Sequence, residues 1–120
     1  MSNVSSWFEE AGRVLDALDA SEPVPKDDQR SVVKQALAAL ASKAPGRSVE
    51  VRVPPFAAVQ VVEGATHRRG TPPAVVEMDT ATWLALALGR LVWVDAIRTG
   101  RVRASGARSD LSGLLPLIEP

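Results

Sequence analysis

Apolar residues recur at intervals of three and four along two N-terminal stretches, residues 6–20 and 28–44. This spacing places them on one side of an amphipathic helix, so each stretch predicts a helix with one buried face. The connection between the two contains Pro23 and Pro25, which predicts a stiff linker rather than a continuous helix. Pro45 then ends the second helix.

The rest of the chain combines two-residue alternation, which is typical of strands, with short helical patterns. Four segments are predicted to be strands: residues 48–53, 56–62, 74–78 and 101–105. Three further segments are predicted to be helices: residues 80–88, 91–98 and 111–115. Helices and strands in this order predict an α+β fold, in which one helical layer covers one sheet.

Two features refine this picture at the ends of the elements. Asp27 or Asp28 is expected to cap the helix 28–44, and Asp79 or Thr80 the helix that follows residue 79, because carboxylate and hydroxyl oxygens accept hydrogen bonds from free N–H groups. The charged polar side of residues 101–105 predicts that this strand lies at the edge of the sheet.

The composition limits the possible functions. The chain has 120 residues, enough for one small domain, with 14 basic and 14 acidic residues and no cysteine. A net charge of zero provides no general attraction for nucleic acid, and the lack of cysteine excludes disulfides and Cys-ligated zinc. The longest apolar run, residues 83–94, is shorter than the ~20 residues needed to cross a bilayer, so no stable membrane insertion is expected. With no leader pattern at the N-terminus, a cytoplasmic location is expected.

Catalytic and metal-binding residues are scarce. His67 is the only imidazole, and Ser105 does not lie in a nucleophile-elbow motif. Glu77 and Asp79 are spaced to share one side of a strand and could do acid–base work, but Asp79 has a simpler role as a helix cap. No phosphate loop or dinucleotide motif is present. We therefore expect a protein without catalytic residues, metal or cofactor.

Two segments allow both a structural and a functional interpretation. The basic run His67, Arg68 and Arg69 is either a solvated surface turn or the binding site of an anionic head group, since arginine matches carboxylate and phosphate geometry. The apolar run 83–94 is not confined to one helical face. It is either the central core helix or part of the wall of a cavity that holds an apolar ligand.

The second half of the chain resembles a known family over about residues 28–117. Spaced glycines, prolines and tryptophans agree in order. They lie in the runs Arg52-Val-Pro-Pro-Phe-Ala-Ala-Val-Gln60, Arg69-Gly-Thr-Pro-Pro73, Trp83-Leu-Ala-Leu86, Trp93-Val-Asp-Ala96 and Gly100-Arg-Val-Arg-Ala-Ser-Gly106. These runs resemble a bacterial, mainly actinobacterial, branch of the sterol carrier protein superfamily. The resemblance implies a mixed sheet of about five strands with helices on one face and an apolar tunnel between the layers.

Members of that superfamily bind or carry sterols, fatty acids or fatty acyl groups and are usually not enzymes by themselves. The resemblance therefore implies a carrier for a hydrophobic small molecule, with residues 28–120 as the sterol-carrier-like domain. Residues 1–27 have no counterpart in the superfamily core, and their pattern and excess of acidic residues predict an acidic N-terminal helix and linker. The head group is expected at His67, Arg68 and Arg69. The expected hydrophobic wall consists of Phe56, Val59, Val61, Val75, Trp83, Leu86, Leu88, Trp93 and Leu114.

An alternative remains open. A similar fold occurs as the C-terminal domain of mycothiol-dependent maleylpyruvate isomerases, where it accompanies a separate catalytic domain. If this chain is related to that C-terminal domain, it is an accessory protein-interaction module with no lipid ligand. A partner enzyme or a homodimer is compatible with either interpretation.

Overall fold

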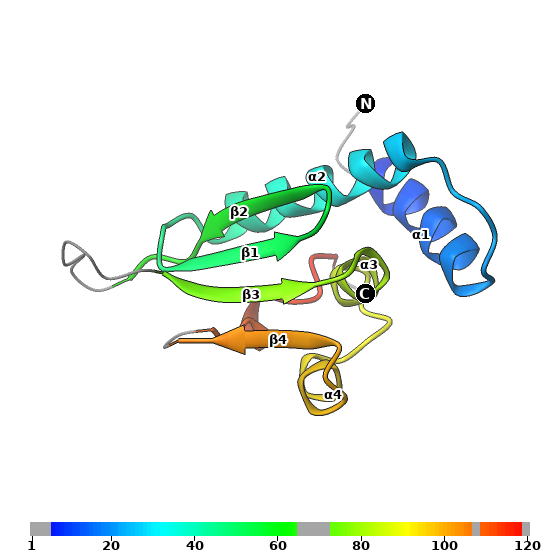
Figure 1. The fold of residues 1–120 in the computed structure, drawn as a ribbon. Coiled ribbons are helices and arrows are strands. Elements are labelled where there is room, and N and C mark those ends of the chain that lie inside the picture. Colours follow the sequence, from blue (N-terminus) through cyan, green and yellow to red (C-terminus); the bar gives the residue numbers. More distant parts are fainter. Residues whose placement is uncertain (1–5, 65–72, 107–108, 119–120) are drawn as a thin grey trace.

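The computed structural model describes residues 6–64, 73–106 and 109–118 and shows the expected α+β architecture (Figure 1). Four strands form one sheet in the order β2-β1-β3-β4, and helices pack against one of its faces. The strands are β1 (Val49–Val53), β2 (Ala57–Val61), β3 (Ala74–Met78) and β4 (Val102–Ser105). The helices are α1 (Ser6–Asp19), α2 (Lys26–Lys43), α3 (Thr80–Ala87) and α4 (Trp93–Arg98).

The sheet is mixed because β1 and β3 run parallel, whereas β1–β2 and β3–β4 are antiparallel. Val51 of β1 lies opposite Val76 of β3, and both side chains are fully buried against the helices. The residues between them in each strand point to the other face, which carries the charged side chains. β4 lies at an edge of the sheet, so the edge position predicted for residues 101–105 is confirmed.

The N-terminal helix α1 contributes to the same core as the rest of the chain. Its apolar stripe, which includes Trp7, Ala11 and Leu15, is buried, and α1 packs against α2 and α3. Arg90 also forms an ion pair with Asp16 of α1, with an N–O distance of 2.6 Å. The division of the chain at residue 27 stays a prediction.

Two expectations at the helix ends were wrong. α2 begins at Lys26 directly after Pro25, whose carbonyl oxygen accepts hydrogen bonds from Asp28 and Gln29, so Asp27 and Asp28 lie in the first turn instead of capping the helix. Pro25 occupies the N-cap position, where the backbone N–H that proline lacks has no intrahelical partner to lose. Residues 111–115 form only a 3-10 turn, Ser112–Leu114, since one turn before Pro116 provides too few hydrogen bonds to sustain an α-helix.

The predicted cap of α3 is confirmed. Asp79 has an extended backbone, and its Oδ1 accepts a hydrogen bond of 2.8 Å from the backbone N–H of Thr82. We expect Asp79→Ala to lower the free energy of unfolding by about 1 kcal/mol, whereas Asp79→Asn keeps the acceptor and loses only a few tenths. Urea denaturation measures both. Equal losses for the two variants would mean that the carboxylate acts through its charge and not as a cap.

No helix in the described ranges is long and apolar enough to span a membrane.

Candidate ligand-binding interior

The predicted wall residues come from several elements, and most of them contribute to one core. Trp83 and Leu86 of α3 and Val61 of β2 are fully buried, and Trp93 of α4 is 9% exposed. The partly buried residues packed against this core include Phe56, Val59, Leu88 and Leu114. The structure thus places eight of the nine predicted wall residues in the core or packed against it.

Val75 lies elsewhere. In β3 the side chains of Ala74, Val76 and Met78 are buried on the helical side, so Val75 points to the opposite face, where it pairs with Glu50 of β1. A shift of one residue moves a side chain to the other face of a sheet, and the apolar run Ala74–Met78 does not reveal which alternation applies.

α3 is the central helix of the core. Seven of its eight residues are buried. α1 and α2 cover part of its surface, and the C-terminal segment, residues 109–118, covers its end: the N–H of Leu117 donates to the carbonyl of Ala87 at 2.9 Å. Lys43 of α2 holds the same segment through a 2.9 Å hydrogen bond from Nζ to the carbonyl of Leu114. This packing explains why the helix is apolar on all sides.

One polar atom in this interior lacks a partner. Trp83 is fully buried, and its indole Nε1 is the only buried side-chain nitrogen or oxygen in the described ranges without a hydrogen-bond partner. Buried indole N–H groups normally find an acceptor, so an unpaired one needs a physical reason.

An apolar hollow of about 300 Å³ lies between α4 and the C-terminal segment. No charged side chain lines it. Its lining residues are Gly89, Leu91, Val92, Trp93, Val94, Ser112, Leu115 and Pro116. Val92 and Val94 at its rim are 61% and 63% exposed, and nearby Ile97 is 39% exposed; these are the exposed large hydrophobic residues of the described chain. The hollow is therefore bordered by the exposed apolar side chains of Val92 and Val94.

Sequence reasoning included Val92 and Val94 only as part of the apolar run 83–94 and did not place them at the rim of a hollow. Val94 and Ile97 are three residues apart in α4 and share its outer side, whereas Trp93 and Ala96 share the buried side. This three-residue spacing was the signal for an exposed and a buried side of α4. It could not be recognised in the sequence because the neighbouring residues are apolar as well.

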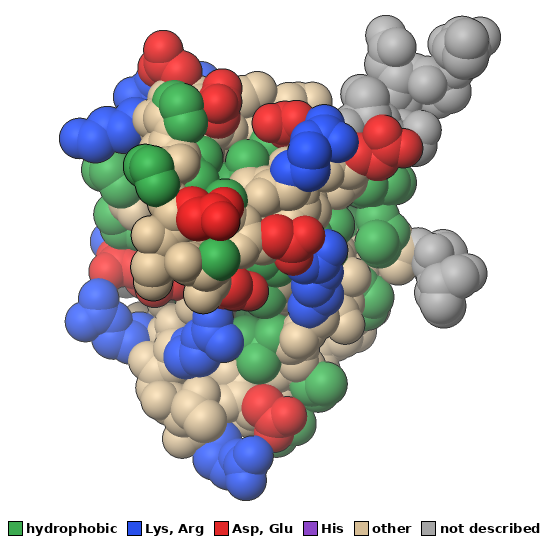
Figure 2. Space-filling view, turned by 90° about the vertical axis from the view of Figure 1, so that its right-hand side faces the viewer, with side chains coloured by type: hydrophobic (Ala, Val, Ile, Leu, Met, Phe, Trp, Pro, Cys, Tyr) green, Lys and Arg blue, Asp and Glu red, His purple; other side chains and the backbone are tan. Residues whose placement is uncertain are grey.

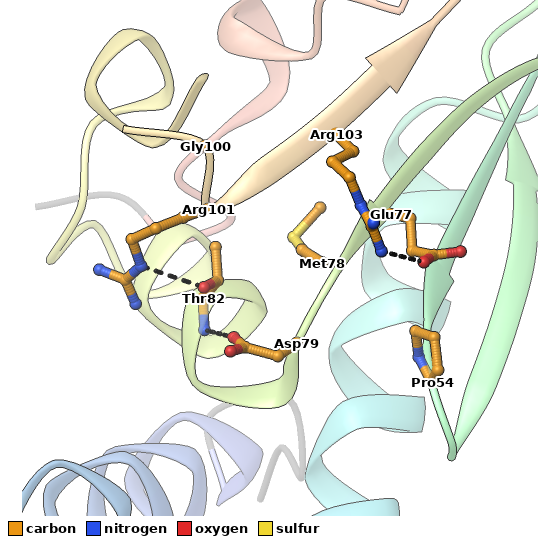
Figure 3. A pocket seen from close by; sticks show the side chains of 8 residues that line it. All are labelled: Pro54, Glu77, Met78, Asp79, Thr82, Gly100, Arg101 and Arg103. Carbon is orange, nitrogen blue, oxygen red and sulfur yellow. Dashed lines mark hydrogen bonds and ion pairs between the residues drawn. The ribbon is translucent and has the colours of Figure 1, made fainter. Parts of the chain in front are cut away.

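A second, polar hollow of about 550 Å³ lies at the start of α3 and β4 (Figure 3). Nε of Arg101 donates to Oγ1 of Thr82 at 3.1 Å, and Arg103 pairs with Glu77 at 2.8 Å; both interactions are drawn in Figure 3. Asp79 also lines this hollow, and its carboxylate caps α3. Both predicted acid–base carboxylates, Glu77 and Asp79, thus have structural partners.

The electrostatics of the open sheet face are local. The pKa of Arg52 is raised above its ordinary value because its guanidinium donates a hydrogen bond to Glu50, and the charges of Glu50 and Glu77 add to this effect. Near the C-terminal segment, the backbone N–H of Ser112 donates to Asp110 and lowers the pKa of that carboxyl. Figure 2 shows the face of the molecule that lies on the right-hand side of Figure 1. Acidic and basic side chains are interspersed over it, so neither sign of charge dominates there.

The predicted head-group residues His67, Arg68 and Arg69 lie outside the described residues. Within the ranges that the structure describes, no cluster of three or more His, Asp or Glu residues could hold a metal ion.

Comparison with protein families supports the resemblance seen in the sequence. Residues 25–117 match the model of a family described as the bacterial SCP ortholog family, where SCP stands for sterol carrier protein. No curated protein matches the chain.

Proposed function

The chain belongs to the bacterial sterol carrier protein family, and from this premise we propose that it binds a hydrophobic ligand and carries out no reaction alone. The ligand is a sterol, a fatty acid or a fatty acyl group. It occupies an apolar tunnel between the sheet and the helices, lined by the predicted wall residues that lie in or against the core, and it enters through the hollow between α4 and the C-terminal segment, which Trp93 also lines.

The observation that carries this proposal is the apolar hollow between α4 and the C-terminal segment. Its volume of about 300 Å³ is at the lower end of the range for small-molecule sites. Because Val92 and Val94 are exposed at its rim, an apolar ligand that approaches this surface removes hydrophobic area from water on both molecules.

An uncharged lining suits a long hydrocarbon. Burial of a chain stabilises the complex by about 0.8 kcal/mol for each CH₂ group, so affinity requires no ion pair in the hollow. Where the ligand has an anionic end, we assign that end to His67, Arg68 and Arg69, since arginine side chains match carboxylate and phosphate groups.

Binding is tested by titration of the protein with a fluorescent sterol and a fluorescent fatty acyl ester. We expect saturable binding of at least one of the two, and a Kd raised about ten-fold or more in Val94→Asp, because a carboxylate at the rim must lose water when the ligand covers it. Val94 is exposed, so this variant should fold normally.

Ala38→Asp is the matched control, since Ala38 is an exposed residue of α2 and does not line the hollow. It should bind like the wild type. If neither probe binds the wild-type protein saturably, the carrier proposal fails and the accessory protein-interaction module becomes the better interpretation. If Val94→Asp and Ala38→Asp bind equally well, the ligand does not use this hollow.

A further inference from the structure

The unpaired indole N–H of Trp83 carries an inference about the ligand. This side chain lies in the first half of α3, is 0% exposed, and has no acceptor for its Nε1 hydrogen. A donor that leaves water without gaining a partner bears its full desolvation cost, which a packed apolar core avoids by using phenylalanine or leucine. An indole at this position is therefore costly unless an acceptor is supplied.

The surrounding core limits what that acceptor can be. The buried residues of the described ranges are apolar except for Thr80 and Thr82, and none of them carries a positive charge. The hydroxyl of Thr82 already accepts a hydrogen bond from Arg101. An ionised carboxylate placed here would be a buried charge without a counter-ion, which is far more costly than a neutral oxygen.

We propose that Trp83 donates its indole hydrogen bond to a neutral oxygen of the bound ligand, such as a sterol hydroxyl or the carbonyl of a fatty acyl ester or thioester. This inference rests on the proposed carrier function and narrows it. A ligand whose only polar group is an ionised carboxylate does not satisfy Trp83. The protein therefore selects sterols or esterified acyl groups over free fatty acid anions.

Trp83 does not line the hollow between α4 and the C-terminal segment, and it is fully buried, so a ligand that enters there contacts the indole only after the side chains packed around Trp83 separate. The indole hydrogen is thus a direct reporter of the bound state. Trp7 and Trp93 are the other two tryptophans, and the partnerless indole nitrogen belongs to Trp83.

The test uses the wild-type protein with three probes delivered from a cyclodextrin complex. They are a long-chain fatty acid methyl ester, the hydrocarbon of equal length, and the free fatty acid at alkaline pH. The indole N–H resonances are followed by ¹H–¹⁵N NMR, and Trp83 is assigned by comparison with Trp7→Phe and Trp93→Phe. We expect the ester to shift the Trp83 indole proton downfield, whereas the hydrocarbon does not.

Affinities provide the second readout. The net free energy of one hydrogen bond corresponds to a Kd about ten-fold lower for the ester than for the hydrocarbon in the wild type. Trp83→Phe keeps a ring in the core without the donor, so the ester and the hydrocarbon should bind this variant equally. Trp7→Phe, which changes a tryptophan of α1 outside the predicted wall and the hollow, should retain the preference.

The outcomes separate the two proposals. If none of the probes binds, the carrier function itself is contradicted. If the ester binds while the Trp83 resonance stays in place, or if the preference for the ester persists in Trp83→Phe, the hydrogen-bond inference is overturned and the carrier function stands. Tighter binding of the ionised fatty acid than of the ester also overturns it. The NMR readout needs no Trp83 variant, so a folding defect in Trp83→Phe does not remove the test.

Discussion

Gly46→Ala is expected to destabilise the protein by about 3 kcal/mol or more, because this position combines backbone strain with a steric clash. Gly46 has a φ of +150°, which side-chain-bearing residues rarely adopt. A Cβ atom built there would overlap the backbone carbonyl of Val62. Since the carbonyl carbon and oxygen of Val62 belong to the main chain, rotation of a side chain cannot relieve the contact. Urea denaturation followed by circular dichroism measures the loss.

Gly113→Ala is the matched control for this methyl group. Gly113 lies in the 3-10 turn, and a Cβ built there meets nothing within 4 Å. Its change in stability should stay within about 0.5 kcal/mol. A Gly46→Ala protein that unfolds at the same urea concentration as Gly113→Ala would show that the backbone at Gly46 can move away from Val62 at little cost in stability.

The close approach of the backbone at Gly46 to Val62 matters because it fixes the position of the sheet relative to α2. The N–H of Val62 donates to the carbonyl of Ala44 at 2.8 Å, and the N–H of Ser48 donates to the carbonyl of Val62 at 3.0 Å. These bonds tie the end of α2 to the end of β2 and the start of β1. The buried side chain of Val61 is thereby held on the helical side of the sheet.

The local elements could be predicted from the sequence because their signals are local. The alternation in residues 48–53 and the cap at Asp79 each depend on neighbours within a few positions, and the structure confirms both. The parallel pairing of β1 and β3 depends on contacts between distant segments. The residue pattern indicated one sheet, and the mixed arrangement was expected only from the resemblance to a family.

The candidate site could be predicted only in part, since it depends on tertiary packing. The orientation of Val75 is set by strand register, which an apolar segment does not specify. The exposure of Val94 and Ile97 depends on which side of α4 meets the core. The missing partner of Trp83 is visible only when all of its neighbours are placed. The features of the site that depend on how distant segments pack were therefore the least accessible to sequence reasoning.

Leu111→Ala is expected to lower the free energy of unfolding by about 2–5 kcal/mol, the range for removal of a fully buried leucine side chain. Leu111 is 0% exposed although it lies in the irregular C-terminal segment. Its side chain therefore anchors a segment that regular secondary structure does not hold. Leu114→Ala is the control, because Leu114 is only partly buried and should cost less.

The loss at Leu111 should also be visible locally. If Leu111 anchors the segment that borders the apolar hollow, the amide of Leu117, which donates to Ala87, should exchange with solvent faster in Leu111→Ala than in Leu114→Ala. A loosened segment widens the hollow, so ligand should dissociate faster from the same variant. Unchanged protection of the Leu117 amide, together with a stability loss below about 1 kcal/mol, would mean that the segment rests on the core without closing it.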